Sequence, residues 1–376
     1  MSASVLLARR NLTRNRVRLV ASVGGVALAL SLTLALDAIY AGVANQLTTY
    51  IDRAGADVWV AQAGVRNLHM VASTLPEAVV DEISAVEGVA AITPILEATD
   101  TVAVGDERAV VYVIGLPTDT AIGGPWEVAE GSNWVGPGEI IVDRSFARKA
   151  GVTIGDSVDV LGGQARIVGL SRGTASLVNS VAFVSFDDFR AMRGGAPVIS
   201  FALVRIAGSA SAGEVAADIE RLVPGVTAQS RAEFVDQERR IVTDMSADVI
   251  SIMSVVGFIV ALAVVALTVY VATLARRRDY GILKALGARN RVLYRVVLVQ
   301  AAISVAVGFA IGLAFTALLS FAIGRTDLNL ELAITVSSLA KVGLFAAVIA
   351  GLAAILPIRQ VAGVDPAVVF RRGAPA

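Results

Sequence analysis

The sequence predicts an α-helical membrane protein with four transmembrane helices in a 1+3 arrangement and an α+β extracytoplasmic domain. The 376-residue chain is 56% hydrophobic and has a mean hydropathy of +0.72. Only 17% of its residues are charged, against about 25% in soluble domains. Four apolar segments are long enough to cross a bilayer. A stretch of mixed polar composition separates the first segment from the other three, which predicts the external domain.

The apolar segments are free of charged residues over their whole length. They are Leu19–Leu36, Val249–Ala275, Val296–Gly324 and Val342–Ile358. An α-helix rises 1.5 Å per residue, so about 20 residues span the hydrocarbon core. The last segment extends back to residue 338 if Lys341 reaches the membrane interface. The first has the basic flank of a signal peptide, but its apolar run exceeds the usual length of about 7–15 residues. We therefore interpret all four as retained membrane helices.

The basic residues are concentrated beside these helices. Residues 1–18, 276–295 and 359–376 together contain 15 basic and 2 acidic residues, whereas the rest of the chain contains 17 and 30. Short loops rich in Lys and Arg stay in the cytoplasm. This predicts cytoplasmic termini, a cytoplasmic loop 276–295 and an external position for residues 37–248. Beside apolar helices, such patches are better explained by topology and lipid contact than by nucleic-acid binding.

Residues 46–230 are predicted to form a split βαβ module that is interrupted by a small β-rich insertion at about 125–195. Strands are predicted at Ala56–Gln62, 101–104, Arg108–Ile114, Phe201–Ile206 and Val226–Ala228. Within the insertion they are predicted at Glu139–Val142, Ser157–Leu161, Ala165–Leu170 and Val181–Ser185. Helices are predicted at Pro76–Glu87, with proline in the first turn, and at Ala212–Leu222.

The segment before the second membrane helix has the pattern of a helix that continues into it. Phe234, Ile241 and Met245 recur at helical spacing, and no strong breaker follows them. Residues 231–275 are thus predicted as one stalk and transmembrane helix. Residues 19–45 are predicted as the first transmembrane helix with a matching stalk. Two such extensions would form a mechanical link.

The sequence offers little catalytic chemistry. It has no cysteine and one histidine, which excludes a Cys/His zinc site and a disulfide framework. It has no Gly-Lys dipeptide, so it has no phosphate-binding P-loop. His69 lies near Ser73, but a lone histidine in a polar stretch is more often a surface residue than a catalytic one. We expect no catalytic residue, no metal and no cofactor in this chain.

Small residues recur at four-residue steps in the last two membrane helices. They are Gly308 and Gly312 in the third helix, and Gly343, Ala347 and Gly351 in the fourth. Such faces let helix backbones approach closely. Packing within one subunit and contact between subunits both remain open, and an oligomer is expected on either interpretation.

Loop 276–295 is predicted to contain a short amphipathic helix. Ile282, Leu283 and Leu286 form its apolar stripe, the other face is basic, and Gly287 can end it in left-handed geometry. Such a helix can lie at the membrane interface or dock in a groove of a soluble partner.

The loop resembles that of the MacB/FtsX-like ABC-transporter permease family, which typically reads R-x-R-E-I-G-[IL]-x-[KR]-A-L-G-A. The matching residues are Arg276, Arg278, Gly281, Ile282, Lys284, Ala285, Leu286, Gly287 and Ala288. Asp279 stands where the family usually has Glu, and Tyr280 where it usually has Ile. The basic stretch from Ala8 and the ending Leu356–Ala367 also resemble family sequences. The external domain resembles the family's only in outline.

The resemblance implies a mechanism and a set of partners. Residues 278–288, including Leu283, would form the coupling helix seated on a separate ATPase subunit, which would bind ATP and Mg. Two permease copies, identical or related, would pair in the bacterial inner membrane. ATP binding would move the external domains to export or extract a substrate, by mechanotransmission. The family leaves room for an extracytoplasmic adaptor or substrate protein.

Two other functions remain open from the sequence. One is an FtsX-like transducer that regulates a cell-wall hydrolase without transport. The other is an anchored binding module with no ATPase at all. The substrate and its binding residues are not readable from the sequence.

Overall fold

The computed structural model describes residues 16–104, 107–175, 180–208, 210–326 and 330–363. They form two compact units. The helical unit contains the residues up to Ala41, Ser246–Arg325 and those from Glu331 onward. The α/β unit contains Gly42–Met245 together with the short segment Thr326–Leu330.

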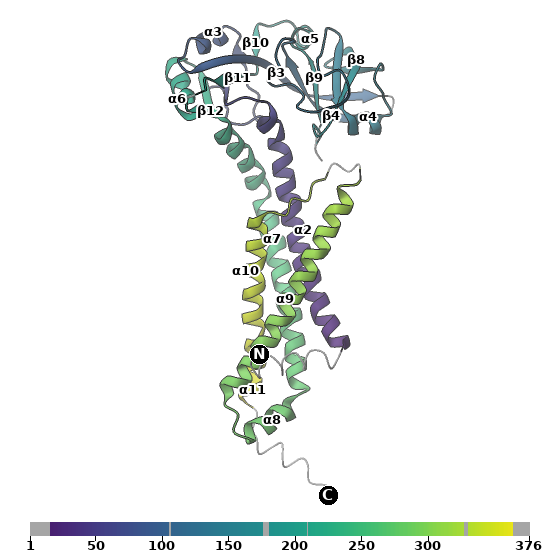
Figure 1. Cartoon of the computed structure of the whole chain (residues 1–376), viewed down its shortest axis with the longest axis vertical. Helices are drawn as coiled ribbons and strands as arrows, with labels where there is room; N and C mark the ends of the chain where they lie inside the picture. The colour runs from purple at the N-terminus through teal and green to yellow at the C-terminus, as the bar shows by residue number, and fades with distance from the viewer. Residues whose placement is uncertain (1–15, 105–106, 176–179, 209, 327–329, 364–376) are drawn as a thin grey trace. The chain divides into compact units, whose positions relative to one another are not determined.

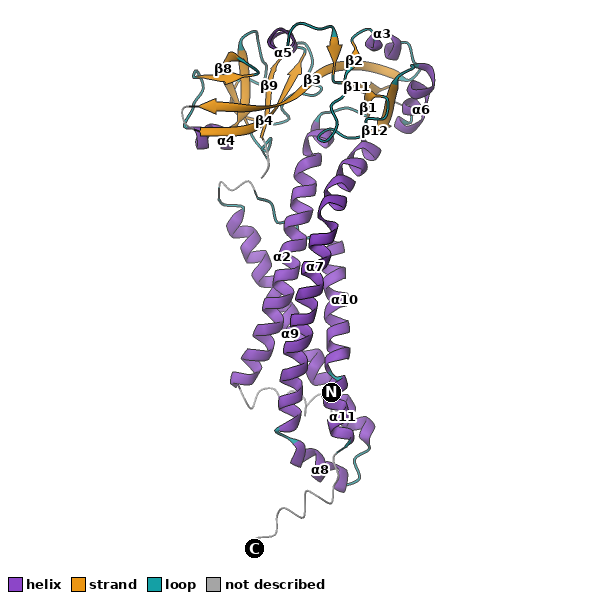
Figure 2. Cartoon of the chain, turned by 180° about the vertical axis from the view of Figure 1, so that it is seen from behind, coloured by secondary structure: helices purple, strands orange, loops and turns teal. Residues whose placement is uncertain are grey.

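The helical unit contains four long helices that run side by side in both views (Figures 1 and 2). They are α2 (Arg16–Arg53), α7 (Arg231–Leu274), α9 (Asn290–Ile323) and α10 (Val336–Ala353), and α10 is followed by the short α11 (Ile355–Ala362). Helical stretches at Val23–Arg53, Ser251–Leu274, Asn290–Ile323 and Val336–Ala362 are long and apolar enough to cross a membrane. The described residues thus confirm the four predicted membrane helices.

These helices pack around a small apolar core. Val26, Leu30 and Leu34 of α2 meet residues of α7, α9 and α10 there, among them Val265, Val297, Val305, Val342 and Ile349. Much of the apolar surface remains exposed, as at Ile252, Ile259 and Leu267 of α7. Exposed aliphatic faces of this kind are suited to lipid or to another apolar helix.

The α/β unit is built on one mixed sheet of ten strands. Its order is β12-β1-β11-β3-β4-β9-β6-β8-β5, and β7 pairs with both β3 and β8. The strands of this sheet are β1 (Val58–Gln62), β3 (Val89–Val104), β4 (Glu107–Leu116), β5 (Val128–Gly131), β6 (Glu139–Asp143), β7 (Ser157–Val160), β8 (Gly163–Ser171), β9 (Ser180–Ser185), β11 (Phe201–Ile206) and β12 (Val226–Ser230). A separate two-stranded sheet joins β2 (Leu75–Pro76) to β10 (Val198–Ile199).

The long strand β3 joins the two halves of the sheet, as Figures 1 and 2 show. Val89–Ile95 pair with β11, and the remainder, from Leu96, pairs with β4. The pairs β4–β9 and β6–β8 are parallel, while the other pairs of this sheet are antiparallel. This mixed α/β architecture agrees with the predicted class of the external domain.

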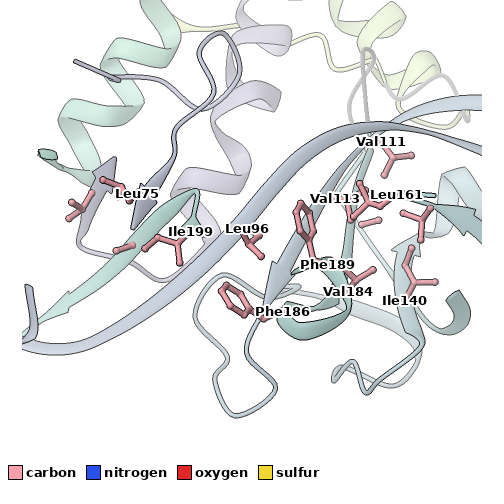
Figure 3. Close-up of a cluster of buried hydrophobic side chains, with 14 of the residues drawn as sticks. Leu75, Leu96, Val111, Val113, Ile140, Leu161, Val184, Phe186, Phe189 and Ile199 are labelled. Carbon is pink, nitrogen blue, oxygen red and sulfur yellow. The ribbon is translucent and has the colours of Figure 1, made fainter. Parts of the chain in front are cut away.

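Two apolar cores cover the opposite faces of this sheet. Because side chains alternate along a strand, Val58 and Val60 join one core while Trp59 and Ala61 join the other. The first core also takes residues from β2, β10 and α5 (Phe186–Met192), shown in Figure 3. It is extended by α3 (Val79–Ser84) and α6 (Ala212–Leu222). The second core is covered by the end of α2 and the start of α7.

Three short helices differ from the sequence prediction. The predicted helix Pro76–Glu87 begins only at Val79, because Pro76 pairs with Val198 in the small sheet. The predicted β-rich insertion also contains α4 (Arg144–Ala150) and α5, which the strand pattern did not indicate. Both start with a side-chain cap, from Asp143 and Ser185 respectively.

The start of α7 is fixed to the sheet by a capping box. The carboxylate of Glu233 accepts hydrogen bonds from the backbone N–H and the hydroxyl of Ser230, at 3.0 and 2.8 Å. One residue later, Phe234 stacks on Trp59 with ring centroids 5.1 Å apart. From there α7 is continuous to Leu274, so α7, like α2, has residues in both units.

Candidate functional site

The short helix predicted in loop 276–295 is present as α8 (Arg277–Ala285). It ends where the N–H of Gly287 donates to the carbonyl of Lys284 and that of Ala288 to the carbonyl of Leu283, at 3.0 and 2.9 Å. Gly287 has a φ of +86°, the left-handed conformation expected from the sequence. The chain then turns directly into α9, with extended backbone at Arg289.

The inner face of α8 is packed against neighbouring helices. Tyr280 is 3% exposed and shares an apolar cluster with Leu293 of α9 and Val361 of α11. Leu283 packs against the same cluster. The ammonium of Lys284 donates to the carbonyl of Ala362 at 2.9 Å, which ties the end of α8 to the end of α11. These contacts hold α8 in a defined orientation.

The outer face of α8 is uncovered. Leu286 is 80% exposed and Ile282 is 39% exposed. The exposed residues around them are Arg277, Arg278, Asp279, Ala285 and Gly287. A rigid helix that presents two aliphatic side chains beside guanidinium groups is suited to an apolar groove with an acidic rim.

The structure divides the predicted stripe of Ile282, Leu283 and Leu286. Leu283 is directed inward, whereas Ile282 and Leu286 form the exposed surface. Gly281 is buried with Tyr280, and Lys284 and Ala288 are half-buried. The inward role of Tyr280 was missed, because the sequence pattern does not show which apolar side chain meets α9.

The two predicted small-residue faces have different surroundings. A Cβ atom at Gly308 would lie 2.6 Å from Cγ1 of Val26, and one at Gly312 would lie 3.0 Å from the carbonyl oxygen of Ala27. These two glycines therefore allow α9 to contact α2 within one chain. In the described part of the chain, no atom lies within 4 Å of a Cβ at Gly343 or Gly351, and Ala347 is exposed. The face on α10 is thus uncovered.

Several contacts in the helical unit were not predicted. A Cβ atom at Gly25 would lie 2.5 Å from Cγ1 of Val264, and one at Gly257 2.5 Å from Oγ1 of Thr33, so glycines also bring α2 and α7 together. Lys341, expected at the membrane interface, donates to the carboxylate of Asp37 on α2. The two residues are far apart in sequence, and only their opposite charges could have suggested the pair.

The expectation that His69 is a surface residue is wrong. It is half-buried rather than a surface residue, and its Nδ1 lies 2.6 Å from Oε1 of Glu238 on α7. Ser73, its neighbour in sequence, is buried and accepts a hydrogen bond from the N–H of Gln62. No group of three metal-ligating side chains occurs among the residues that the structure describes.

Parts of the predicted cytoplasmic flanks lie outside the described residues. This holds for residues 1–15 of the basic N-terminal helix and for residues 364–376 of the tail. The described portion of the ending motif includes Pro357 and Arg359 in α11, where Pro357 is buried.

Two family models match the chain. One, described as the MacB-like periplasmic core domain, matches residues 19–222, more than half of the sequence. The other, described as the FtsX-like permease C-terminal domain, matches residues 251–366. Together with the four membrane-type helices, these matches define a multi-pass membrane protein of the permease class. The chain belongs to the MacB/FtsX-like ABC transporter permeases, as its loop motif predicted.

The relatives agree with this assignment over nearly the full length. An uncharacterized ABC transporter permease of Mycobacterium bovis is 25% identical over 367 residues, which cover 96% of this chain and 98% of the relative. One from Mycobacterium tuberculosis is 25% identical over 369 residues, with the same coverage. Permease subunits of this family are not themselves catalytic, and membership implies an ATPase partner.

Two solved structures are similar to part of the chain. The periplasmic region of MacB from Actinobacillus actinomycetemcomitans aligns with 48% of this chain and 92% of its own length, at 13% identity and a TM-score of 0.38. The extracellular domain of the noncanonic ABC-type transporter YknZ from Gram-positive bacteria aligns with 46% and 100%, at 13% identity and a TM-score of 0.37.

Replacing Tyr280 with phenylalanine is expected to preserve or raise stability, by about 1 kcal/mol. The buried hydroxyl of Tyr280 has no hydrogen-bond partner among the described residues, and burial raises the pKa of this phenol. Removing the hydroxyl removes an uncompensated desolvation cost, whereas Tyr280→Ala leaves a cavity that costs about 3–5 kcal/mol. Thermal unfolding of the purified chain in detergent measures both changes. A clear loss of stability in Tyr280→Phe would contradict this account.

Proposed function

We propose that this permease couples ATP hydrolysis by a separate ATPase subunit to movement of its α/β unit, for export or extraction of a substrate. The observation that carries the proposal is α8: its inner face is fixed by Tyr280, Leu283 and Lys284, while Ile282 and Leu286 are exposed. A helix braced in this way transmits force applied to its outer face. The residues proposed to dock or position the ATPase are Arg278, Asp279, Tyr280, Gly281, Ile282, Leu283, Lys284, Ala285, Leu286, Gly287 and Ala288.

The route of the movement is proposed to be α7. This helix begins at the sheet, with Phe234 in the second apolar core, and continues without a break to Leu274, two residues before the loop that contains α8. A continuous helix converts displacement at one end into displacement at the other. The α/β unit is proposed to lie outside the inner membrane of a bacterial cell, with both chain termini in the cytoplasm. The seven basic residues in loop 276–295 support this orientation.

The proposed assembly contains two permease copies and two ATPase subunits, with ATP and Mg bound by the latter. The uncovered small-residue face of Gly343, Ala347 and Gly351 supports close contact with another helix, because backbones can approach there. The exposed apolar surface of α7 is available to lipid or to the second copy. An extracytoplasmic adaptor or substrate protein is a further proposed partner.

Leu286→Asp is expected to weaken assembly with the ATPase partner at least tenfold. Burying one leucine side chain contributes about 1.5–3 kcal/mol, and 1.4 kcal/mol corresponds to a factor of ten in affinity. Gly287→Asp should have a similar effect, because its left-handed conformation disfavours a side chain. Co-purification and ATP turnover of the complex in nanodiscs measure the loss.

The matched control is Leu222→Asp, which makes the same change at an exposed leucine of α6 in the α/β unit. It should leave assembly and turnover unchanged. Because Leu286 is exposed, Leu286→Asp should also leave the thermal stability of the isolated chain unchanged. Undiminished assembly and turnover in both loop variants would refute the docking proposal and favour an anchored module with no ATPase.

An FtsX-like transducer would need the same loop, so the loop variants do not distinguish it from a transporter. Capture of a cell-wall hydrolase instead of cargo by the α/β unit would identify a transducer.

A further inference from the structure

The α/β unit contains a buried ionisable group at the point where α7 joins the sheet. Glu238 of α7 is only 1% exposed in its side chain. Its Oε1 lies 2.6 Å from Nδ1 of His69, and its Oε2 accepts a hydrogen bond of 2.7 Å from the backbone N–H of Leu68. Both partners lie in loop 63–74, which connects β1 to β2. One carboxylate thus attaches this loop to the helix.

We propose that His69, Glu238 and the Leu68 amide form a proton-dependent clasp that fastens loop 63–74 to α7 and loosens when Glu97 ionises. The clasp is a property of the α/β unit and does not depend on the proposed ATPase coupling. Its chemistry follows from one imidazole that contacts the carboxylate of Glu238 and interacts electrostatically with that of Glu97.

Glu97 lies on the face of the sheet that the clasp contacts. In the β3–β4 pair, Glu97 is opposite Ile114, which belongs to the core covered by α2 and α7. Tyr112 is two residues from Ile114 on β4 and therefore points to the same face. The ring of Tyr112 meets the imidazole of His69 edge-on, with centroids 4.6 Å apart. This places Glu97 and His69 over adjacent positions of the sheet.

Burial, together with two nearby ionisable groups, accounts for the titration of Glu97. Burial raises the pKa of Glu97 from its ordinary 4.5 to about 7, with His69 acting to lower it and Glu238 to raise it. Below about pH 7 Glu97 is neutral, and Glu238 is the carboxylate that faces the imidazole. Above it, a second negative charge lies near Glu238, and the two carboxylates repel each other.

Other ionisable groups on the surrounding elements interact more weakly with Glu97 than His69 and Glu238 do. Tyr50 of α2 donates its hydroxyl to the carbonyl of Gly123 at 3.0 Å. Arg66 on the loop, Asp236, Arg239 and Arg240 on α7, and Asp52 and Arg53 at the end of α2 are exposed to solvent. Their interactions are screened far more than those of Glu238, which is buried.

The direction in which stability changes with pH follows from the raised pKa of Glu97. In the folded chain Glu97 binds a proton up to about pH 7, whereas in the unfolded chain it releases the proton near its ordinary pKa of 4.5. The folded state therefore binds more protons in this interval, and its stability decreases as pH rises from about 4.5 to 7. The clasp should be closed at pH 5.5 and looser at pH 8.5.

Hydrogen exchange of the full chain in nanodiscs tests the clasp, because the Leu68 amide donates directly to Glu238. The measured quantity is the protection factor of the Leu68 amide between pH 5.5 and 8.5, corrected for the intrinsic pH dependence of exchange. We expect a decrease on the order of tenfold across pH 7, the change that one pKa unit of coupling produces. The amides of Met70 and Val71 are an internal control, because they donate to the side chain of Asn67 instead.

Three variants separate the clasp from a structural role. Glu97→Gln should keep Leu68 protected at all pH values, because glutamine cannot ionise. The variant also resembles the neutral form of Glu97, so it should not disturb the fold. Glu238→Gln keeps an acceptor for Leu68 but loses the charge, so protection at pH 5.5 should decrease about tenfold. Asp236→Asn, an exposed change on the same helix, should behave as the parent chain. A parent profile without a pH step, or a step that persists in Glu97→Gln, would overturn the proposal.

Discussion

Gly308→Leu is expected to separate α9 from α2 and to lower the stability of the helical unit by about 3 kcal/mol or more. A Cβ atom there would lie 2.6 and 2.8 Å from the Cγ1 and Cβ atoms of Val26, and 3.3 Å from the backbone nitrogen of Ala27. The side chain of Val26 is anchored at its Cβ and cannot move aside, so the helices must part. Titration of the detergent-solubilised chain with a denaturing detergent, followed by circular dichroism, measures the loss.

Gly343→Leu is the matched control on α10, because it makes the same change in the other small-residue face. In the described structure no atom lies within 4 Å of a Cβ at Gly343, so the isolated chain should keep its stability to within about 0.5 kcal/mol. Equal losses in the two variants would show that the α10 face is also covered within one chain. A loss of pairing with unchanged stability would instead support its contact with a second copy.

The contrast between these two faces shows what a sequence pattern can and cannot predict. Spacing at four residues identified Gly308, Gly312, Gly343, Ala347 and Gly351 as close-packing candidates, because the period of a helix is fixed. Which helix lies opposite depends on the arrangement of α2, α7, α9 and α10, which no local pattern encodes. The first pair meets α2, and the second set is uncovered in the described chain.

Elements with a strong local signal were predicted closely. The bounds of α6 agree with the predicted Ala212–Leu222, since one amphipathic face meets the core through Val215 and Ile219. The continuity of α7 followed from the absence of a breaker. The short helices α4 and α5 were missed although their caps, Asp143 and Ser185, are visible in the sequence. Each has only seven residues, too few to show a period between closely spaced strands.

Contacts between segments that are distant in the chain could not be predicted from the sequence. Pro76 is a favourable first residue of a helix, but pairing with Val198 held it in a strand instead. His69 and Glu238 are 169 positions apart, and only the fold brings the imidazole to the carboxylate. Likewise, the apolar stripe of α8 was recognised, while its division into an inward Leu283 and an outward Leu286 required the position of α9 and α11.

Phe234→Ala is expected to destabilise the α/β unit by about 3–5 kcal/mol. The ring of Phe234 is buried, stacks on Trp59 at 5.1 Å and meets Phe201 edge-on at 6.1 Å, so its removal leaves a cavity among aromatic side chains. It is also the first large side chain by which α7 contacts the sheet. Denaturant unfolding of the full chain in detergent, followed by the fluorescence of Trp59 in a variant with the other two tryptophans replaced by phenylalanine, measures the loss.

The conservative change Phe234→Leu should retain much of the packing and cost less than about 2 kcal/mol, since it leaves a smaller cavity. If α7 transmits movement, Phe234→Ala should also reduce substrate export by the assembled complex more than it reduces ATP turnover, because docking at α8 is intact while the far end of the helix has lost its anchor. Proportional loss of both activities would mean that the variant acts only through stability. Full export despite a destabilised α/β unit would show that force reaches the sheet by a route other than α7, with the end of α2 as the alternative contact in the same core.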